Sequence, residues 1–314
     1  MFFTWIPQLG RHILWLSLKS WVYLAAMMFL AWFLPLIATA ILTGLSIAVP
    51  KQMIWIFNIY PYAVILTCIF LWIYHERMHQ RWLAERTPVV EPASLRHTLE
   101  HISQLARRNR SPSIVMRYDT TLRPDDMSVS IAFTTGSILF AARAIIQQCT
   151  EKEVRAFYAH EIAHLKHLDI PVGHFINTGF WTILLATFVA FLWMCLGGSL
   201  GDEPVHIVAW MIVFVVFFGA YCLYLLLGAA HSRCREYLAD AGAVALTSWS
   251  DRDACISMVL KIAHTISRKN PALLFGEDVG FYTLEFHPTL ADRAKALRVV
   301  YTFLSDDTVA FTKM

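Results

Sequence analysis

Two five-residue stretches, His75–His79 and His160–His164, each carry histidines four residues apart, with a glutamate directly after the first. On a helix, side chains at positions i and i+4 project from one face, so the two imidazoles can share a metal ion. The glutamate can then activate a metal-bound water, which is the chemistry of hydrolytic zinc sites. In this composition, chance predicts only about 0.02 such patterns, so both stretches need an explanation.

The stretch His160–His164 has the context that a catalytic site requires. Thr150–Glu153 form a capping box, which predicts the start of a helix that runs through "VRAFYAHEIAHLKHL" to a stop near Asp169. The residues between the histidines are uncharged, so the face of the helix that carries them can pack in a core. Glu161 would remove a proton from the zinc-bound water and later deliver it to the leaving amine.

A catalytic zinc ion takes three protein ligands and leaves one position open. His167 is near in sequence, but it lies about 10 Å from His160 along a straight helix, so we expect it to be solvated or to cap the helix. A metzincin site would need glycine at position 167 and histidine at position 170, where the chain has histidine and isoleucine.

The segment "SRCREYLAD" offers two carboxylates, Glu236 and Asp240, again four residues apart. Glu236 could complete a His-His-Glu site, and Asp240 could accept a hydrogen bond from a ligand histidine and fix its tautomer. Taken alone, the segment could equally be an exposed helix with surface ion pairs.

The composition indicates a membrane protein, because 57% of residues are hydrophobic, only 16% are charged and the mean hydropathy is +0.51. The net charge of +3 gives no reason to expect nucleic-acid binding, and the six cysteines include no Cys-x-x-Cys pair. Four stretches free of Asp, Glu, Lys and Arg predict spans near Trp21–Val49, Ile54–Tyr74, Thr178–Leu196 and Val205–Leu227.

Lys and Arg residues favour one side of these spans, which places both termini and all long polar segments in the cytoplasm. The polar segments together have the size of one domain. We therefore predict an N-terminal transmembrane hairpin at 1–75, a second hairpin at 170–230, and one domain divided between 76–169 and 231–314. Within it we expect strands at Ser113–Tyr118 and within Met127–Ala141, and helices at Leu95–Arg108, Arg233–Leu246, Arg252–Ser267 and Leu290–Leu304.

The chain contains "AHEIAHLKHLD" and, after a predicted hairpin, "SRCREYLADAGAVAL"; this pairing resembles the HtpX-like membrane zinc endopeptidases, relatives of the CAAX prenyl endoprotease. Two further stretches are similar to the family's edge strand with the lead-in to its active-site helix, "IAFTTGSILFAARAIIQQCTEKEVRAFYAHE", and to its His-Pro-x-x-x-x-Arg element, "FHPTLADRAKAL". The resemblance covers about 95–300. It implies a mainly α membrane protein with four transmembrane helices and a cytoplasmic α+β gluzincin-type zinc protease domain, which the second hairpin splits.

The resemblance also implies the site residues. One Zn²⁺ per chain would be bound by His160, His164 and Glu236, with Glu161 as the general base and Asp240 orienting a ligand.

Two further elements come with the resemblance. His287 and Arg293 would approach the site, to stabilise an oxyanion or to hold the ligand glutamate; His287 could instead cap the last helix. The family usually has Asn-Ala-Phe where this chain has Ile131-Ala132-Phe133, a strand that would bind peptide through its backbone.

The resemblance and the predicted topology imply a zinc endopeptidase of protein quality control, in the bacterial inner membrane, that cleaves misfolded or membrane proteins at the cytoplasmic face. Its partners would be protein or peptide substrates and the lipid bilayer, with no nucleic acid. One alternative is a zinc-binding sensor or scaffold without proteolytic activity, but a structural zinc ion needs a fourth protein ligand. A transporter would need more ionisable residues inside the spans.

The first stretch, His75–His79, begins where the second predicted span ends. Arg77, Arg81 and Arg86 make it resemble a basic collar at the membrane boundary. We interpret it as a helix anchor, with an accessory metal site as the alternative.

Overall fold

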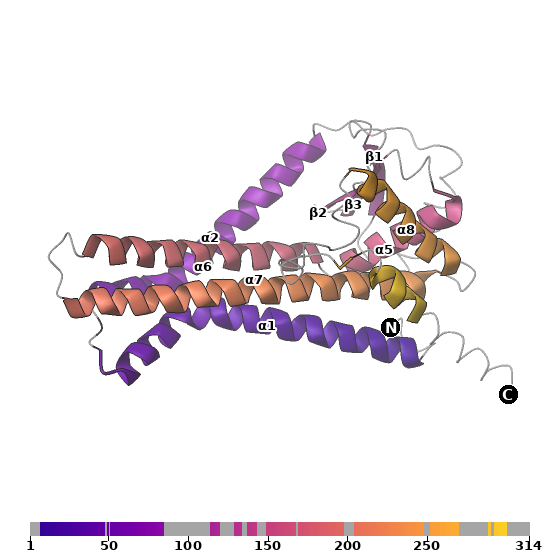
Figure 1. Cartoon of the computed structure of the whole chain (residues 1–314). Helices are drawn as coiled ribbons and strands as arrows, with labels where there is room; N and C mark the ends of the chain where they lie inside the picture. Colours follow the sequence, from indigo (N-terminus) through magenta and orange to yellow (C-terminus); the bar gives the residue numbers. More distant parts are fainter. Residues whose placement is uncertain are drawn as a thin grey trace. The chain divides into compact units, whose positions relative to one another are not determined.

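The computed structural model describes residues 7–47, 49, 51–84, 114–119, 129–133, 137–142, 149–167, 169–197, 204–247, 252–269, 288–289 and 292–299. Its helices are α1 (Pro7–Gly44), α2 (Lys51–Ala84), α5 (Glu151–Lys166), α6 (Asp169–Gly197), α7 (Pro204–Leu246) and α8 (Arg252–Lys269), with a further helix at 292–299 (Figure 1). The predicted helix Leu95–Arg108 lies outside the described residues, and Leu290–Leu304 is described only in part.

The chain divides into two compact units. The helical unit comprises Trp21–His75 and Pro171–His231, and the sheet unit comprises Met1–Ser20, Glu76–Ile170 and Ser232–Met314. Every candidate site residue belongs to the sheet unit. The predicted division into two transmembrane hairpins and one domain formed by two segments stays a prediction.

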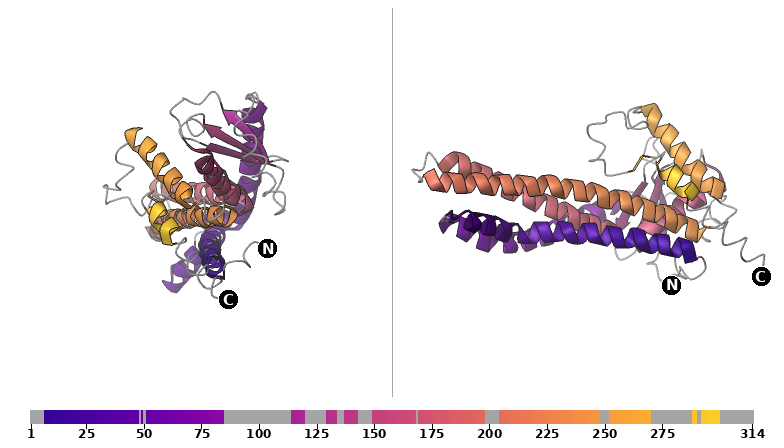
Figure 2. Two further views of the ribbon diagram at one scale, coloured as in Figure 1. Left: turned by 90° about the vertical axis from the view of Figure 1, so that its right-hand side faces the viewer. Right: turned by 60° about the horizontal axis from the view of Figure 1, so that its bottom comes forward.

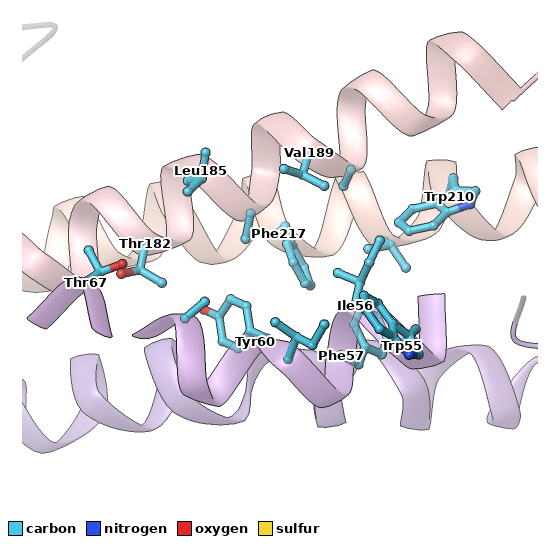
Figure 3. A pocket seen from close by; sticks show the side chains of 15 residues that line it. Trp55, Ile56, Phe57, Tyr60, Thr67, Thr182, Leu185, Val189, Trp210 and Phe217 are labelled. Carbon is cyan, nitrogen blue, oxygen red and sulfur yellow. The ribbon is translucent and has the colours of Figure 1, made fainter. Parts of the chain in front are cut away.

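The helical unit is held together by an apolar core that includes Leu34 of α1, Ile183 of α6 and Trp210 of α7. Helices α6 and α7 lie side by side (Figure 2), and the Tyr224 hydroxyl on α7 donates a 2.8 Å hydrogen bond to the carbonyl of Ile176 on α6. This bond satisfies a polar group in an apolar surrounding. An apolar pocket lies between α2, α6 and α7 (Figure 3), with threonines of α2 and α6 at one end and tryptophans of α2 and α7 at the other.

Three helices in the described part of the chain are long and apolar enough to cross a membrane: Arg11–Gly44, Phe175–Leu196 and His206–Leu246. Large apolar side chains on them are exposed, which is typical of a surface that faces lipid rather than water. The chain is therefore an integral membrane protein. The predicted span Ile54–Tyr74 lies within α2, and the count of four spans stays a prediction.

Helix α7 is longer than predicted. The sequence suggested a span at Val205–Leu227 and a separate helix at Arg233–Leu246, whereas the structure has one helix of 43 residues. The linking residues contain no proline, so nothing removes a backbone hydrogen bond or blocks the helix there. As a result, Glu236 and Asp240 lie on the same continuous helix as an apolar candidate span.

The sheet unit contains a three-stranded sheet of order β1-β3-β2. Its strands are β1 (Ile114–Asp119), β2 (Val129–Phe133) and β3 (Ser137–Ala142), and they lie close to the segments predicted to be β. Strand β1 is parallel to β3, whereas β2 is antiparallel to it and pairs Ile131 with Leu139. Strand β2, which carries Ile131-Ala132-Phe133, therefore lies at one edge of this sheet.

Helix α5 begins with the predicted capping box. The backbone N–H of Thr150 donates to Glu153 Oε2 at 2.7 Å, and that of Glu153 donates to Thr150 Oγ1 at 3.4 Å. Glu153 is buried and also accepts hydrogen bonds from Ser257 and Lys261 of α8, the latter at 2.7 Å. These bonds fix the start of α5 against α8.

Candidate metal centre

Helices α5 and α7 approach closely because a glycine faces an alanine. A Cβ added at Gly242 of α7 would lie 2.7 Å from the Cβ of Ala163 on α5, closer than two carbon atoms can pack. Ile162 and Ala163 on α5, and Leu238 and Ala239 on α7, are buried. This packing brings the two helices that carry the candidate ligands together.

The predicted ligands form one group. The ligand atoms of His160, His164 and Glu236 all lie within 4.8 Å of one another. The two Nε2 atoms are 3.0 Å apart, and they lie 3.6 Å (His160) and 3.7 Å (His164) from the Glu236 carboxylate oxygens. Tetrahedral zinc ligands at about 2.0–2.1 Å from the metal lie about 3.3 Å from each other, so this donor set fits a zinc ion.

Glu161 lies on the same helix, directly after His160, and is half-buried. It points about 100° around the helix from His160, which suits a group that reaches a bound water rather than the metal. Its charge is close enough to act on both His164 and Arg293.

Asp240 and Arg293 form a network behind His160. Asp240 Oδ1 lies 2.9 Å from His160 Nδ1, and Arg293 donates to both oxygens of Asp240 at 2.7 and 2.9 Å. The Arg293 Nη1 is also 3.2 Å from Glu236 Oε2. Burial opposes the charge of Arg293, but Asp240 and Glu236 raise its pKa, so the guanidinium stays charged.

The position of Arg293 follows from a helix cap. The backbone N–H of Asp292 donates to Thr289 Oγ1 at 3.1 Å, and the Thr289 hydroxyl donates to the Asp292 side chain at 2.7 Å. Thr289 thus caps this helix. His287, for which the sequence also allowed a capping role, lies outside the described residues. Arg293 follows in the first turn of this helix.

A second network of hydrogen bonds and ion pairs lies behind His164, and it was not predicted from the sequence. His164 Nδ1 is hydrogen-bonded to Asp169, Asp169 is paired with Arg235, and Arg235 also donates to the carbonyl of His167. The sequence predicts only a helix stop near Asp169, and it leaves Arg235 in a segment whose charges could form surface ion pairs. The available signal was a carboxylate five residues after His164 together with a cation beside Glu236.

The surroundings of the two histidines shift their pKa values in opposite directions. Burial and Arg293 oppose protonation of His160, but its hydrogen bonds to Asp240 and Glu236 outweigh them and raise its pKa. Burial and the neighbouring His160 lower the pKa of His164.

The other histidine pair lies on α2, which continues through His75–His79. Arg77 is exposed. The side chains of His75 and His79 lie outside the described residues, so the anchor interpretation stays a prediction.

Comparison with known proteins identifies the family of the chain. The model of peptidase family M48 matches residues 95–300. The chain is 29% identical over 187 residues to "Protease HtpX homolog" of Helicobacter pylori strain J99, with 53% of this chain and 56% of that protein covered. It is also 29% identical over 184 residues to "Protease HtpX homolog" of Aeropyrum pernix, with 55% and 53% covered.

Other relatives match over different lengths. The chain is 27% identical over 236 residues to "Protease HtpX" of Legionella pneumophila strain Corby, with 67% of this chain and 79% of that one covered. The match spans about half the length of the Helicobacter and Aeropyrum relatives. Among solved structures, Ste24p of S. mikatae is similar with a TM-score of 0.48 and 18% identity, over 92% of this chain and 66% of that one. Because the family model matches well over half of its residues, the chain belongs to peptidase family M48.

Proposed function

We propose that the chain is a membrane-embedded zinc-dependent endopeptidase. The observation that carries the proposal is the group formed by His160, His164 and Glu236, whose ligand atoms lie within 4.8 Å of one another. Two imidazoles and one carboxylate are the donors of a catalytic zinc site with one open position. A structural site, as in a sensor or scaffold, would need a fourth protein ligand, and the group found among the described residues has three.

The residues around this group have distinct roles in the proposed reaction. A bound zinc ion would lower the pKa of a coordinated water and polarise the peptide carbonyl. Glu161 would accept the proton of that water and then donate it to the nitrogen of the leaving amine. Asp240 would accept the Nδ1 proton of His160, which leaves Nε2 free to bind the metal.

Arg293 would hold the ligand carboxylate rather than stabilise an oxyanion. Its guanidinium is engaged by Glu236 and Asp240, and its side chain is only 12% exposed. His287 keeps its proposed catalytic role as an expectation from sequence.

Strand β2 would bind the substrate. An edge strand can pair with an extended peptide through its backbone, so Ile131 in place of the family's asparagine does not prevent this pairing. The apolar helices would hold the site at the membrane surface, which suits misfolded proteins and the polar loops of membrane proteins. By the distribution of Lys and Arg, the site and both termini would face the cytoplasm of a bacterium.

The variant Glu161→Gln tests the mechanism. We expect the purified wild type to bind one zinc ion and to cleave an unfolded membrane protein, and Glu161→Gln to bind the same amount of zinc without cleavage. Glu151→Gln is the matched control, because Glu151 is an exposed residue in the first turn of the same helix. Cleavage at the wild-type rate by Glu161→Gln would disprove the mechanism, whereas zinc binding by a wild type that cleaves nothing would favour the sensor.

A further inference from the structure

We propose that Asp169 and Arg235 are a positioning pair that orients His164 for metal binding and connects it to helices α6 and α7. The proposal rests on the proposed function for the nature of the bound metal. It concerns residues to which the sequence had assigned no part in the site.

Asp169 contacts both His164 and Arg235 and so connects the two. Asp169 uses one carboxylate oxygen for Nδ1 of His164 and the other for the guanidinium of Arg235. The side chains of His164, Asp169 and Arg235 are only 13%, 16% and 8% exposed. A pair of charges this sheltered from water is retained only with good mutual contacts, and removing one partner leaves the other uncompensated.

The hydrogen bond to Asp169 decides which nitrogen of His164 can bind a metal. A carboxylate facing Nδ1 keeps the proton on that atom, so the lone pair lies on Nε2. Nε2 is the atom that faces the other ligands, 3.0 Å from His160 Nε2 and 3.7 Å from Glu236 Oε1. Without Asp169, neither the tautomer nor the ring orientation of His164 would be specified by this contact.

Arg235 links three helices at this point. It contacts Asp169, the first residue of α6, and donates to the carbonyl of His167, which follows the last residue of α5. Arg235 also directly precedes the candidate ligand Glu236 on α7. Its side chain therefore holds the end of α5 close to the candidate ligands His164 and Glu236.

The pair repeats the arrangement behind His160, with one difference. Each histidine has a carboxylate at Nδ1 and an arginine on that carboxylate: Asp240 and Arg293 for His160, Asp169 and Arg235 for His164. Behind His160, only Asp240 lies on a helix with a candidate span, because Arg293 lies in the helix at 292–299. Behind His164, both residues lie on such helices, Asp169 at the start of α6 and Arg235 on α7. The orientation of His164 therefore depends on the ends of membrane helices.

A simpler role for Asp169 is to stabilise the start of α6 by its charge near the helix N-terminus. Asp253 provides the matched control for this role, because it is the acidic residue in the first turn of α8 and is exposed. Exposed Arg298, in the helix at 292–299, is the corresponding control for Arg235.

The test uses the full chain in detergent, with Asp169→Ala, Asp169→Asn, Arg235→Gln and Arg235→Lys beside Asp253→Asn and Arg298→Gln. Zinc affinity is measured by competition with a chelator. We expect Asp169→Ala to weaken zinc binding by about 10- to 100-fold, the usual effect of losing a carboxylate behind a ligand histidine. Asp169→Asn should weaken it less, because the amide oxygen can still accept the Nδ1 proton.

The Arg235 variants should also bind zinc more weakly than the wild type. Arg235→Gln should weaken zinc binding because it leaves Asp169 uncompensated, and Arg235→Lys should restore part of the loss because it keeps the charge. The visible absorption of Co²⁺ bound in place of zinc should change in Asp169→Ala, since it reports ligand geometry, and should stay as in the wild type in both controls.

Wild-type zinc affinity and an unchanged Co²⁺ spectrum in Asp169→Ala would overturn the proposal, even if that variant melted at a lower temperature. An equal loss of affinity in Asp253→Asn and Asp169→Asn would overturn it in favour of the helix-start role. If Asp169→Ala fails to fold, Asp169→Asn and Arg235→Lys decide. Because these measurements need metal binding alone, they hold even if the wild type proves to cleave no peptide.

Discussion

One five-residue pattern occurs on two helices, and the two regions differ in what surrounds it. Both α2 and α5 are helical throughout the pattern, so the spacing of the histidines is the same in each. On α5 the residues between the histidines, Ile162 and Ala163, are buried against the core, whereas Arg77 in the corresponding part of α2 is exposed. On α5 a third ligand approaches from α7. Local geometry permits a metal site, but packing against a second helix is what completes it.

The most direct way to break this comparison is to remove each histidine pair in turn. Replacing His160 and His164 with alanine should abolish tight zinc binding, because a single carboxylate remains in the group. Replacing His75 and His79 should leave the zinc content unchanged. Metal analysis after dialysis against a weak chelator measures both. Loss of zinc from the His75/His79 variant would show that the assignment of the site to α5 is wrong.

The sequence predicted the parts of this site that depend on local chemistry. The capping box and the helical spacing placed His160 and His164 on one face of a helix. The residues alone left Glu236 and Asp240 either near these histidines or on an exposed helix, and in the structure both lie beside them. The role of Asp169 could not be predicted in this way, because aspartate favours both the end of one helix and the start of the next. Arg235 was equally ambiguous, since a cation after an apolar span is the ordinary boundary signal.

The continuity of α7 was missed for a different reason. A change from apolar to charged residues marks a change of environment, and we interpreted it as a change of helix. The structure has both environments along one helix, because the residues between them contain no helix-breaking proline. The close packing of α5 against α7 likewise depends on two segments that are far apart in the sequence, so neither segment alone could predict it.

The start of each helix offers a second contrast. Helix α5 begins with Glu153 anchored to α8, whereas the first turn of α2 has no acidic residue. Burial opposes the charge of Glu153, but hydrogen bonds from Lys261, Ser257 and Thr150 outweigh it and lower its pKa to about 2. The carboxylate thus stabilises the fold above its unfolded pKa of about 4.3, and this contribution is lost as the pH falls towards 2.

Glu153→Gln should therefore lower the free energy of unfolding by about 2–3 kcal/mol at neutral pH. Thermal unfolding in detergent between pH 7 and pH 3 measures the effect, and the difference from wild type should shrink below about pH 4.5. Glu151→Gln, at an exposed position of the same turn, should change stability much less. A difference between Glu153→Gln and wild type that stayed constant to pH 3 would contradict this account.

The smallest expected effect concerns the contact that brings α5 to α7. Gly242→Ala places a methyl group against Ala163 and should cost about 1–3 kcal/mol, with weaker zinc binding because Glu236 is moved away from the histidines. Gly219→Ala on the same helix meets nothing within 4 Å and should be neutral or slightly stabilising. The double variant Ala163→Gly with Gly242→Ala recreates the space on the opposite helix and keeps the number of helical glycines unchanged, so it should recover zinc affinity. Recovery would show that the distance between α5 and α7, rather than the identity of either residue, completes the pattern on α5. Zinc affinity as low as in Gly242→Ala alone would refute that explanation.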